Sequence, residues 1–255
     1  MSVELKSPAE MDLMRQAGKI HAEVRALLME AVRPGVTGTE LDQLAKRAIG
    51  ERGAEPTFVG YGTRMGKPPY PGAICFSVNE ELVHGIPSDR VLKEGDIVSI
   101  DLGVTYQGYV ADAAFTAPVG PVSSEATALM EATRTALWAG IEMTVPGKRL
   151  GDVSHAIGRC AEGRYGIIRG YGGHGVGRKM HMEPHIPNYG RPGIGLRLMP
   201  GMVFALEPML AVGRPETTEL DDQWTVTMRD GSLSAHFEET VAITEHGPEV
   251  LTRVD

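Results

Sequence analysis

Cysteine, aromatic residues and long apolar segments are all scarce in this 255-residue chain. The only two cysteines, Cys75 and Cys160, lie in unrelated contexts, which argues against a structural disulfide and favours a reducing compartment. No apolar segment approaches the roughly 20 residues that a membrane-spanning helix needs. Residues 1–11 lack the basic start and apolar stretch of a secretory signal, so we expect a cytoplasmic protein without a membrane partner.

Positive charge is also in the minority, since 25 Lys and Arg against 33 Asp and Glu give a formal net charge of -8. Such a balance argues against general attraction to nucleic acid or to an anionic membrane surface. A composition of 42% hydrophobic and 23% charged residues is ordinary for a globular protein. The length fits one catalytic domain over residues 1–255, built from two halves that share a core.

An internal repeat organises the chain into two halves, 7–120 and 121–250. In the first half, Ser7-Pro8-Ala9-Glu10 is a capping box that begins a helix, and 40–52 is a second helix. In the second half, Ser124 is predicted to cap a helix through 142, and 152–162 is the next helix. Each helix pair precedes glycine-punctuated strands, so we predict an α+β fold made of duplicated helix-helix-sheet units related by a pseudo-twofold axis.

Acidic residues occur at matching positions of the two halves. The segment 95–101 begins with glycine and ends on Asp101, and the segment 201–207 begins with glycine and ends on Glu207. Asp112 lies on the strand after Asp101, across a predicted turn at 105–108 that would place the two acids directly opposite each other. Facing carboxylates in an apolar sheet repel each other unless a cation lies between them.

The last strand carries two adjacent acids. A second hairpin is predicted at 229–231, and strict alternation beyond it places Glu238 with His236 on a polar face. Glu239 then falls on the apolar face. Alternation alone does not say which face meets a metal, so Glu238 is preferred over Glu239 only because it shares the polar face with His236.

Histidines gather near glycines in two further segments. Residues 172–177 surround His174 with glycine, His181 follows closely, and His84 lies in Val83-His84-Gly85. A single histidine in such a place is usually structural, but several beside paired acids favour a site. The remaining His21, His155 and His246 are interpreted as surface or helix residues.

One histidine with several carboxylates differs from a structural zinc site, which favours thiolates, and from the calcium-binding loop of an EF-hand. The mixture of nitrogen and oxygen donors suits two divalent transition-metal ions such as Co, Mn, Fe or Zn. Five donors are too many for one catalytic ion that keeps an open position, which favours two ions with shared carboxylates.

These motifs closely resemble the type I methionine aminopeptidases of bacteria over nearly the whole chain. The resemblance is carried, in order, by Ser77-Val78-Asn79 with Val83-His84-Gly85-Ile86-Pro87, Asp96 to Asp101 with Asp112, Gly173-His174-Gly175-Val176-Gly177 with His181-Met182-Glu183-Pro184, Gly201 to Pro208, and Ser234-Ala235-His236-Phe237-Glu238. It implies the pita-bread fold and removal of the initiator methionine from nascent proteins and peptides that carry a small second residue.

The resemblance also implies a role for each matching residue. The metal ligands would be Asp101, Asp112, His174, Glu207 and Glu238. The catalytic residues would be His84, His181 and Glu207. The substrate-binding residues would be His84, His181, Tyr70, Cys75, Met180 and Trp224, with Tyr61 near them. We expect a monomer that acts on peptide N-termini, with the ribosome as a candidate partner and no direct contact with nucleic acid.

Three features depart from the family pattern. Met180 stands where an aromatic residue is common, His236 stands where glutamine is more common, and the connection 63–69 is longer than usual. Trp224 and the methionines are equally consistent with a plain hydrophobic core. A proline-specific peptidase of the same fold and a non-catalytic binding protein are the alternative functions. The segment His84-Gly85-Ile86-Pro87 argues against the proline-specific peptidase. A non-catalytic binding protein would be expected to lose metal ligands, whereas all five are present here.

Overall fold

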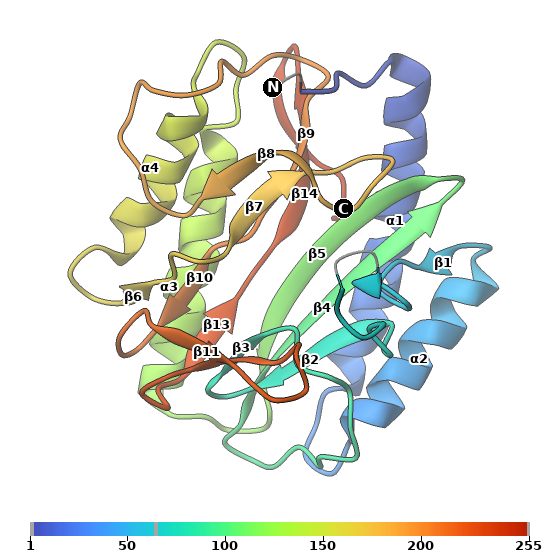
Figure 1. Ribbon diagram of the computed structural model, residues 1–255, viewed down its shortest axis with the longest axis vertical. Helices are drawn as coiled ribbons and strands as arrows, with labels where there is room; N and C mark the ends of the chain where they lie inside the picture. Colours follow the sequence, from blue (N-terminus) through green and yellow to red (C-terminus); the bar gives the residue numbers. More distant parts are fainter. Residues whose placement is uncertain (1–2, 64–65, 254–255) are drawn as a thin grey trace.

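Two helix pairs lie on opposite sides of a curved layer of strands (Figure 1). The computed structural model describes residues 3–63 and 66–253. The helices are α1 (Pro8–Ala31), α2 (Gly38–Glu51), α3 (Ser124–Glu142) and α4 (Leu150–Ala161). No helix of these described ranges is long and apolar enough to cross a membrane. Arg64 and Met65, in the long connection noted above, lie outside the described residues.

The strands form four sheets within the described residues. Sheet one contains β1 (Glu55–Pro56), β2 (Ile74–Val78), β4 (Ile97–Tyr106) and β5 (Tyr109–Pro118). Sheet two contains β7 (Gly172–Gly175), β8 (Met182–Pro187), β9 (Val203–Leu206), β14 (Glu239–Thr244) and β15 (Gly247–Val250). Sheet three contains β6 (Gly166–Ile167), β10 (Met209–Ala211) and β13 (Ser234–His236). Sheet four contains β3 (Glu81–Val83), β11 (Thr217–Glu219) and β12 (Val226–Met228).

The predicted helices are present, with shifts at three starts, and α2 begins at Gly38, two residues before the predicted start at residue 40. Ser7 caps α1 through the predicted capping box with Glu10. The cap of α3 is Ser123 rather than Ser124, because the Ser123 hydroxyl accepts from the amide of Ala126. Helix α4 begins at Leu150, two residues before the predicted Asp152, whose carboxylate accepts from the backbone amide at the helix start.

The duplication appears in matching backbone hydrogen bonds. The amide of Gly35 donates to Leu92, and the amide of Gly147 donates to Leu198, each just before the second helix of its half. Gly95 and Gly201 both have positive φ, +94° and +92°, and each lies two residues before its strand, β4 or β9. The left-handed region is open to glycine without a Cβ clash, which explains this residue at both strand starts. The boundaries 7–120 and 121–250 stay a prediction.

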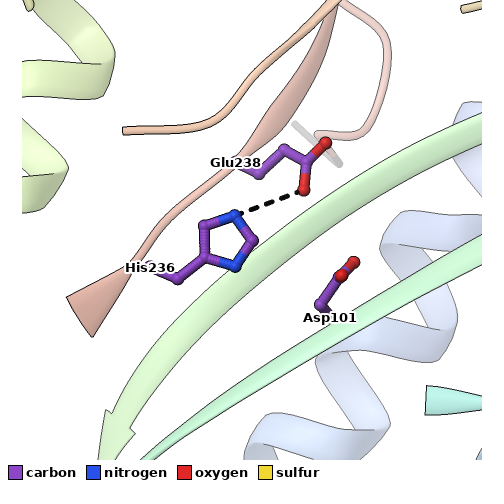
Figure 2. A group of neighbouring side chains, drawn as sticks. All are labelled: Asp101, His236 and Glu238. Atoms are coloured by element: carbon purple, nitrogen blue, oxygen red, sulfur yellow. Dashed lines mark ion pairs between the residues drawn. The ribbon is translucent and has the colours of Figure 1, made fainter. Parts of the chain in front are cut away.

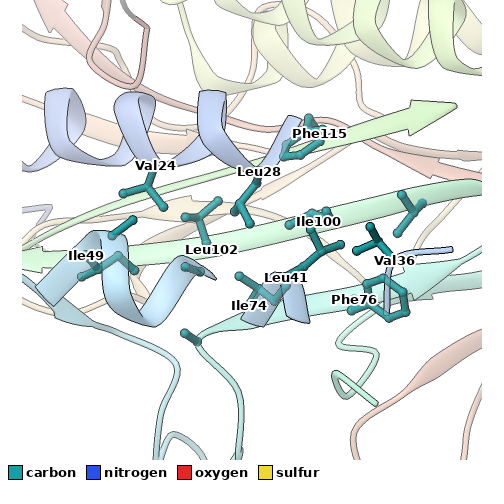
Figure 3. Close-up of a cluster of buried hydrophobic side chains, with 14 of the residues drawn as sticks. Val24, Leu28, Val36, Leu41, Ile49, Ile74, Phe76, Ile100, Leu102 and Phe115 are labelled. Carbon is teal, nitrogen blue, oxygen red and sulfur yellow. The ribbon is translucent and has the colours of Figure 1, made fainter. Parts of the chain in front are cut away.

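Each half has its own hydrophobic core between its helix pair and its sheet. In the first half, Val24 and Leu28 of α1 and Leu41 of α2 pack on Ile100 and Leu102 of β4 (Figure 3). The corresponding core of the second half is formed by α3, α4, β9 and β14, with these members: Leu137, Ile157, Phe204, Val241. The helices therefore cover the outer faces of the sheets and leave the inner faces for polar groups.

The two halves meet where β5 lies beside the segment that joins β13 to β14. The amide of Glu238 donates to the carbonyl of Ala114 at 2.9 Å. Two residues away on each segment, the hydroxyl of Thr240 accepts from the amide of Asp112 and donates to its carbonyl. These contacts bring an acid from each half to the same seam.

The first hairpin has a different register from the predicted one. Both turn residues, Gln107 and Gly108, have positive φ, as in the two-residue turns that suit twisted strands. Asp101 therefore pairs with Ala114, and Asp112 pairs with Gly103. Asp101 also lies within β4 instead of at its end. The two acids share a face as diagonal neighbours rather than direct partners.

The second predicted hairpin is wrong. The chain turns at 229–231, but β12 before the turn pairs with β11 and β3, whereas β13 after it pairs with β10. His21 is a helix residue, one of the two alternatives expected for it, and not a surface residue. It lies on α1 but is fully buried, and its Nε2 donates to the carbonyls of Leu102 and Ala113.

An ion pair fixes the strand that follows Glu238. Glu239 is 8% exposed and accepts from Arg25 of α1 at 2.9 Å and from the hydroxyl of Thr252. Arg25 also donates to the carbonyl of Thr252 at 2.7 Å. Glu239 is thereby turned away from the inner face, as alternation predicts, and its carboxylate is already neutralised.

Replacing Arg25 by Ala should destabilise the protein by about 3–5 kcal/mol at pH 7.5, because the substitution leaves the Glu239 carboxylate buried and unpaired. Burial already raises the pKa of Glu239, so the loss should shrink as the pH falls and this carboxyl is protonated. Urea unfolding at pH 7.5 and 5 would measure both effects. The double variant Arg25→Ala with Glu239→Gln should be more stable than Arg25→Ala; the opposite order would refute the pairing.

Candidate metal centre and substrate cavity

All five side chains predicted to bind metal line one cavity of about 340 Å³. Asp101 lies on β4, Asp112 on β5 and His174 on β7. Glu207 directly follows β9, and Glu238 lies between β13 and β14. Acids of both halves therefore meet at the seam between them, as the repeat predicts.

The carboxylates at the floor of this cavity repel one another. Burial raises the pKa of Asp101 to about 7, and burial with the charge of Asp101 raises the pKa of Asp112 well above its usual range. Burial and the neighbouring aspartates raise the pKa of Glu207 and Glu238 in the same way. One oxygen each of Asp101, Asp112 and Glu238 is buried without a hydrogen-bond partner. Such an arrangement is costly unless cations neutralise it.

His174 is oriented to offer one nitrogen to this cluster. Its Nδ1 lies 3.0 Å from the carbonyl of Gly175, which can only accept, so Nδ1 carries the hydrogen. The lone pair is then on Nε2, which lies 3.8 Å from Asp112 Oδ2 and 3.6 Å from Glu207 Oε1. A hydrogen bond at the other ring nitrogen is the usual way to fix a metal-binding tautomer.

The spacing of these atoms fits divalent ions. Two donors about 2.1 Å from a tetrahedral ion lie about 3.4 Å apart, close to the separations around His174. Within the described residues, two groups offer donor atoms within 4.8 Å of one another: Asp112, His174 and Glu238, and Asp101, His236 and Glu238. The second group is shown in Figure 2. Glu238 belongs to both groups, as a carboxylate shared by two ions would.

His236 lies at the floor of the cavity but is absent from the site predicted from the sequence. It is 2% exposed, and its Nε2 lies 3.5 Å from Glu238 Oε2 and 3.7 Å from Glu207 Oε2. The alternation that grouped His236 with Glu238 was the available signal. The strand is interrupted between them, yet both side chains reach the same floor.

Apolar and aromatic side chains form the walls of the cavity. Tyr70, Cys75 and Trp224 pack together with Phe58, and Met180 lies against them. The hydroxyl of Tyr70 donates to the carbonyl of Gly85 at 2.8 Å, so its polar end is occupied. Trp224 is thus both buried packing and cavity wall. Phe58, Tyr171, Lys67 and Glu219 also line the cavity and carried no recognisable signal in the sequence.

The two remaining predicted histidines lie above the floor. His181 is at the exposed rim, its ring 4.3 Å from that of His174, and its Nδ1 lies 2.6 Å from the hydroxyl of Tyr61. His84 packs edge-on against Tyr171 and Trp224. Burial lowers the pKa of His84 to about 4, so its ring is neutral near pH 7. Every predicted site residue therefore lies in one cavity.

Comparisons with known proteins agree with this geometry. The sequence profile of metallopeptidase family M24 matches residues 12–245. A methionine aminopeptidase of Aquifex aeolicus is 49% identical over 260 aligned residues, covering all of both chains. The crystal structure of methionine aminopeptidase from Thermotoga maritima matches with a TM-score of 0.95 and 43% identity, covering 99% of this chain and 100% of that one.

More distant structures share the fold alone. A prolidase from Pyrococcus furiosus matches with a TM-score of 0.76 and 23% identity, covering 98% of this chain and 66% of that one. The expected pita-bread fold is confirmed by these matches. The protein is a metal-dependent hydrolase. The alternative hypothesis of a non-catalytic binding protein is therefore not supported. The chain belongs to metallopeptidase family M24 and, within it, to the methionine aminopeptidases.

Proposed function

We propose that this enzyme removes the N-terminal methionine from peptides and nascent proteins, with two divalent ions at the floor of its cavity. The observation that carries the proposal is a cavity with apolar walls whose floor holds buried carboxylates with oxygens that have no hydrogen-bond partner among the described residues. The wall suits a thioether side chain, and the floor suits cations that attract a free amino group. The identity to methionine aminopeptidases supports the same substrate.

Two ions would be held by the five predicted ligands, with Asp112 and Glu238 shared between them. The overlap of the two donor groups at Glu238 supports the sharing of Glu238, and the sharing of Asp112 follows from the family resemblance. Mixed carboxylate and imidazole donors suit Co, Mn, Fe or Zn. Bound ions would supply Lewis acidity at the scissile carbonyl and lower the pKa of a water molecule.

Glu207 would move the proton during hydrolysis. Its carboxylate lies 3.6 Å from His174 Nε2 and 3.7 Å from His236 Nε2, at the floor where water would attack the scissile carbonyl and the amine would leave. Asn188 donates to the Glu207 carbonyl at 2.9 Å and holds the residue in place. Glu207 would accept a proton from the attacking water and return it to the leaving nitrogen.

His181 and His84 would hold the two sides of the scissile amide. With the Tyr61 hydroxyl donating to Nδ1 of His181, the hydrogen lies on Nε2, where it can stabilise an oxyanion. His84 would contact the peptide nitrogen from the opposite wall. The methionine side chain would pack among Tyr70, Cys75, Met180 and Trp224, and burial keeps the Cys75 thiol neutral by raising its pKa.

A preference for a small second residue is part of the proposal. The rim is narrowed on one side by Tyr61 with His181, and on another by Lys67, whose ammonium contacts Glu219 at 2.5 Å and the Trp224 ring at 5.1 Å. A bulky second side chain would collide with these groups. We also place the enzyme in the cytoplasm as a monomer that meets nascent chains at the ribosome, in keeping with two free cysteines.

The substrate assignment is tested by comparing Met-Gly-Met with a matched Xaa-Pro peptide. We expect cleavage of Met-Gly-Met after methionine and no measurable cleavage before or after proline. Preference for the proline peptide would instead favour the activity of the distant prolidases. Met-Ala-Ser and Met-Leu-Ser then test the second position, and equal kcat/KM for both would contradict the preference for a small residue.

Replacing Glu207 by Gln should lower kcat by about 10²–10⁴-fold, because proton transfer by a positioned carboxylate contributes about that much. Met180→Phe should change kcat less than about tenfold and act mainly on KM, since it alters only the wall. Steady-state kinetics on Met-Ala-Ser with metal content measured in each variant would separate the roles. Glu245→Gln, at an exposed carboxylate, is the control. Similar small losses at Glu207 and Met180 would sink the assignment of Glu207.

Replacing Asp101 by Asn should stabilise the metal-free enzyme at pH 7.5 by about 1–3 kcal/mol, or about 2–10 °C for this length. The raised pKa of Asp101 means that the folded state binds its proton more tightly than the unfolded state does. Asp101 therefore costs stability increasingly as the pH rises from about 4 to about 7, and the advantage of Asn should shrink as the pH falls and vanish by about pH 4.

Thermal unfolding in EDTA measures this effect, with the exposed Asp221→Asn as control. Added Co²⁺ should reverse the order, because the wild type gains the ligand-binding energy that the variant has partly lost. A lower unfolding temperature for Asp101→Asn in EDTA at pH 7.5 would show that the carboxylates do not repel one another as described.

A further inference from the structure

His236 lies among the floor carboxylates, and within the part of the chain that the structure describes its Nε2 has no hydrogen-bond partner. Its side chain is 2% exposed, and its Nε2 is buried with no hydrogen bond. The nearest acceptors, on Glu238 and Glu207, are 3.5 and 3.7 Å away. Those separations exceed the 2.7–3.2 Å of an N–H to oxygen hydrogen bond. A buried imidazole that serves only structure would be expected to have a closer partner.

The backbone of His236 is held tightly in this position. Its amide donates to the hydroxyl of Thr116 at 2.9 Å, and the same hydroxyl donates to the carbonyl of His236 at 2.8 Å. Thr240 makes the same pair of bonds to the backbone of Asp112, four residues further along each segment. The backbones of Asp112 and His236 are therefore each held by two hydrogen bonds to a threonine hydroxyl across the seam.

The geometry around His236 is that of a ligand. The imidazole and the carboxylates of Asp101 and Glu238 face a common space in Figure 2, and each offers a donor atom within 4.8 Å of the others. Two donors on one tetrahedral ion lie about 3.4 Å apart, which matches the 3.5 Å between His236 and Glu238. An ion bound by both atoms would lie beside the line that joins them, on the side of Asp101.

We propose that His236 is a sixth ligand of the centre, donating an imidazole nitrogen to the ion held by Asp101 and Glu238. The inference rests on the proposed two-ion site and extends it. Without His236, that ion would have only carboxylate oxygens, while the ion beside Asp112 has His174. With His236, each ion has one imidazole.

The added nitrogen should change which metal the centre prefers. Imidazole favours Zn, Co and Fe, whereas a site of carboxylates alone suits Mn. Replacing His236 by Gln should therefore weaken binding of Zn²⁺ or Co²⁺ at one of the two positions by at least about tenfold. Binding of Mn²⁺ should weaken by less than about threefold. His246→Gln, at an exposed histidine, should leave both affinities unchanged.

The direct test is long-range ¹H–¹⁵N NMR of the histidine rings in the wild-type enzyme, titrated with Zn²⁺ from the metal-free state. Signals are assigned by their loss in His236→Gln and His174→Gln. We expect Nε2 of both histidines to move to metal-bound shifts over two equivalents of zinc. The zinc titration follows the wild type, so the variants serve only to assign the signals.

The possible outcomes separate the inference from the proposed site. If Nε2 of His174 responds and that of His236 does not, the site stands and His236 is not a ligand. If no histidine responds and calorimetry detects no zinc uptake, the two-ion proposal itself fails. Equal losses of Zn²⁺ and Mn²⁺ affinity in His236→Gln, together with an unmoved His236 signal, would assign the residue to packing alone.

Discussion

Mutual repulsion among buried carboxylates is the constraint on which the rest of this structure depends. Four acids and two imidazoles share the floor of one cavity, and burial with neighbouring charge raises the pKa of every one of the acids. Folding must hold these groups together against their own electrostatics. The hydrophobic cores of the two halves supply that stability from outside, and divalent ions at the floor would remove the repulsion from inside.

The duplicated architecture solves the problem of delivering acids to one place. Each half has a helix pair that covers the outer face of its sheet, so the inner faces can carry polar groups. The seam then joins Asp112 to Thr240 and Ala114 to Glu238 by direct hydrogen bonds. Polar floor and apolar wall are thus made by different elements, which allows metal chemistry and methionine recognition to be adjusted separately.

Much of this arrangement is predictable from the sequence because strands and helices have fixed periods. Capping residues predict the starts of the helices within one or two positions, and the strands that follow a glycine indicate the internal repeat. The position of Asp101 relative to Asp112 was wrong by two residues, since turn type depends on backbone angles at Gln107 that its identity does not dictate. His236 was passed over because only the fold brings its ring next to Asp101, which is 135 positions earlier in the chain.

The most direct test of the metal centre is anomalous diffraction from crystals of the enzyme grown with Co²⁺, recorded on both sides of the cobalt absorption edge. The account predicts two anomalous peaks in each chain, both beside the Glu238 carboxylate, with one near His174 and the other near Asp101. A floor without a cobalt peak, or with a single peak at full occupancy, would contradict it.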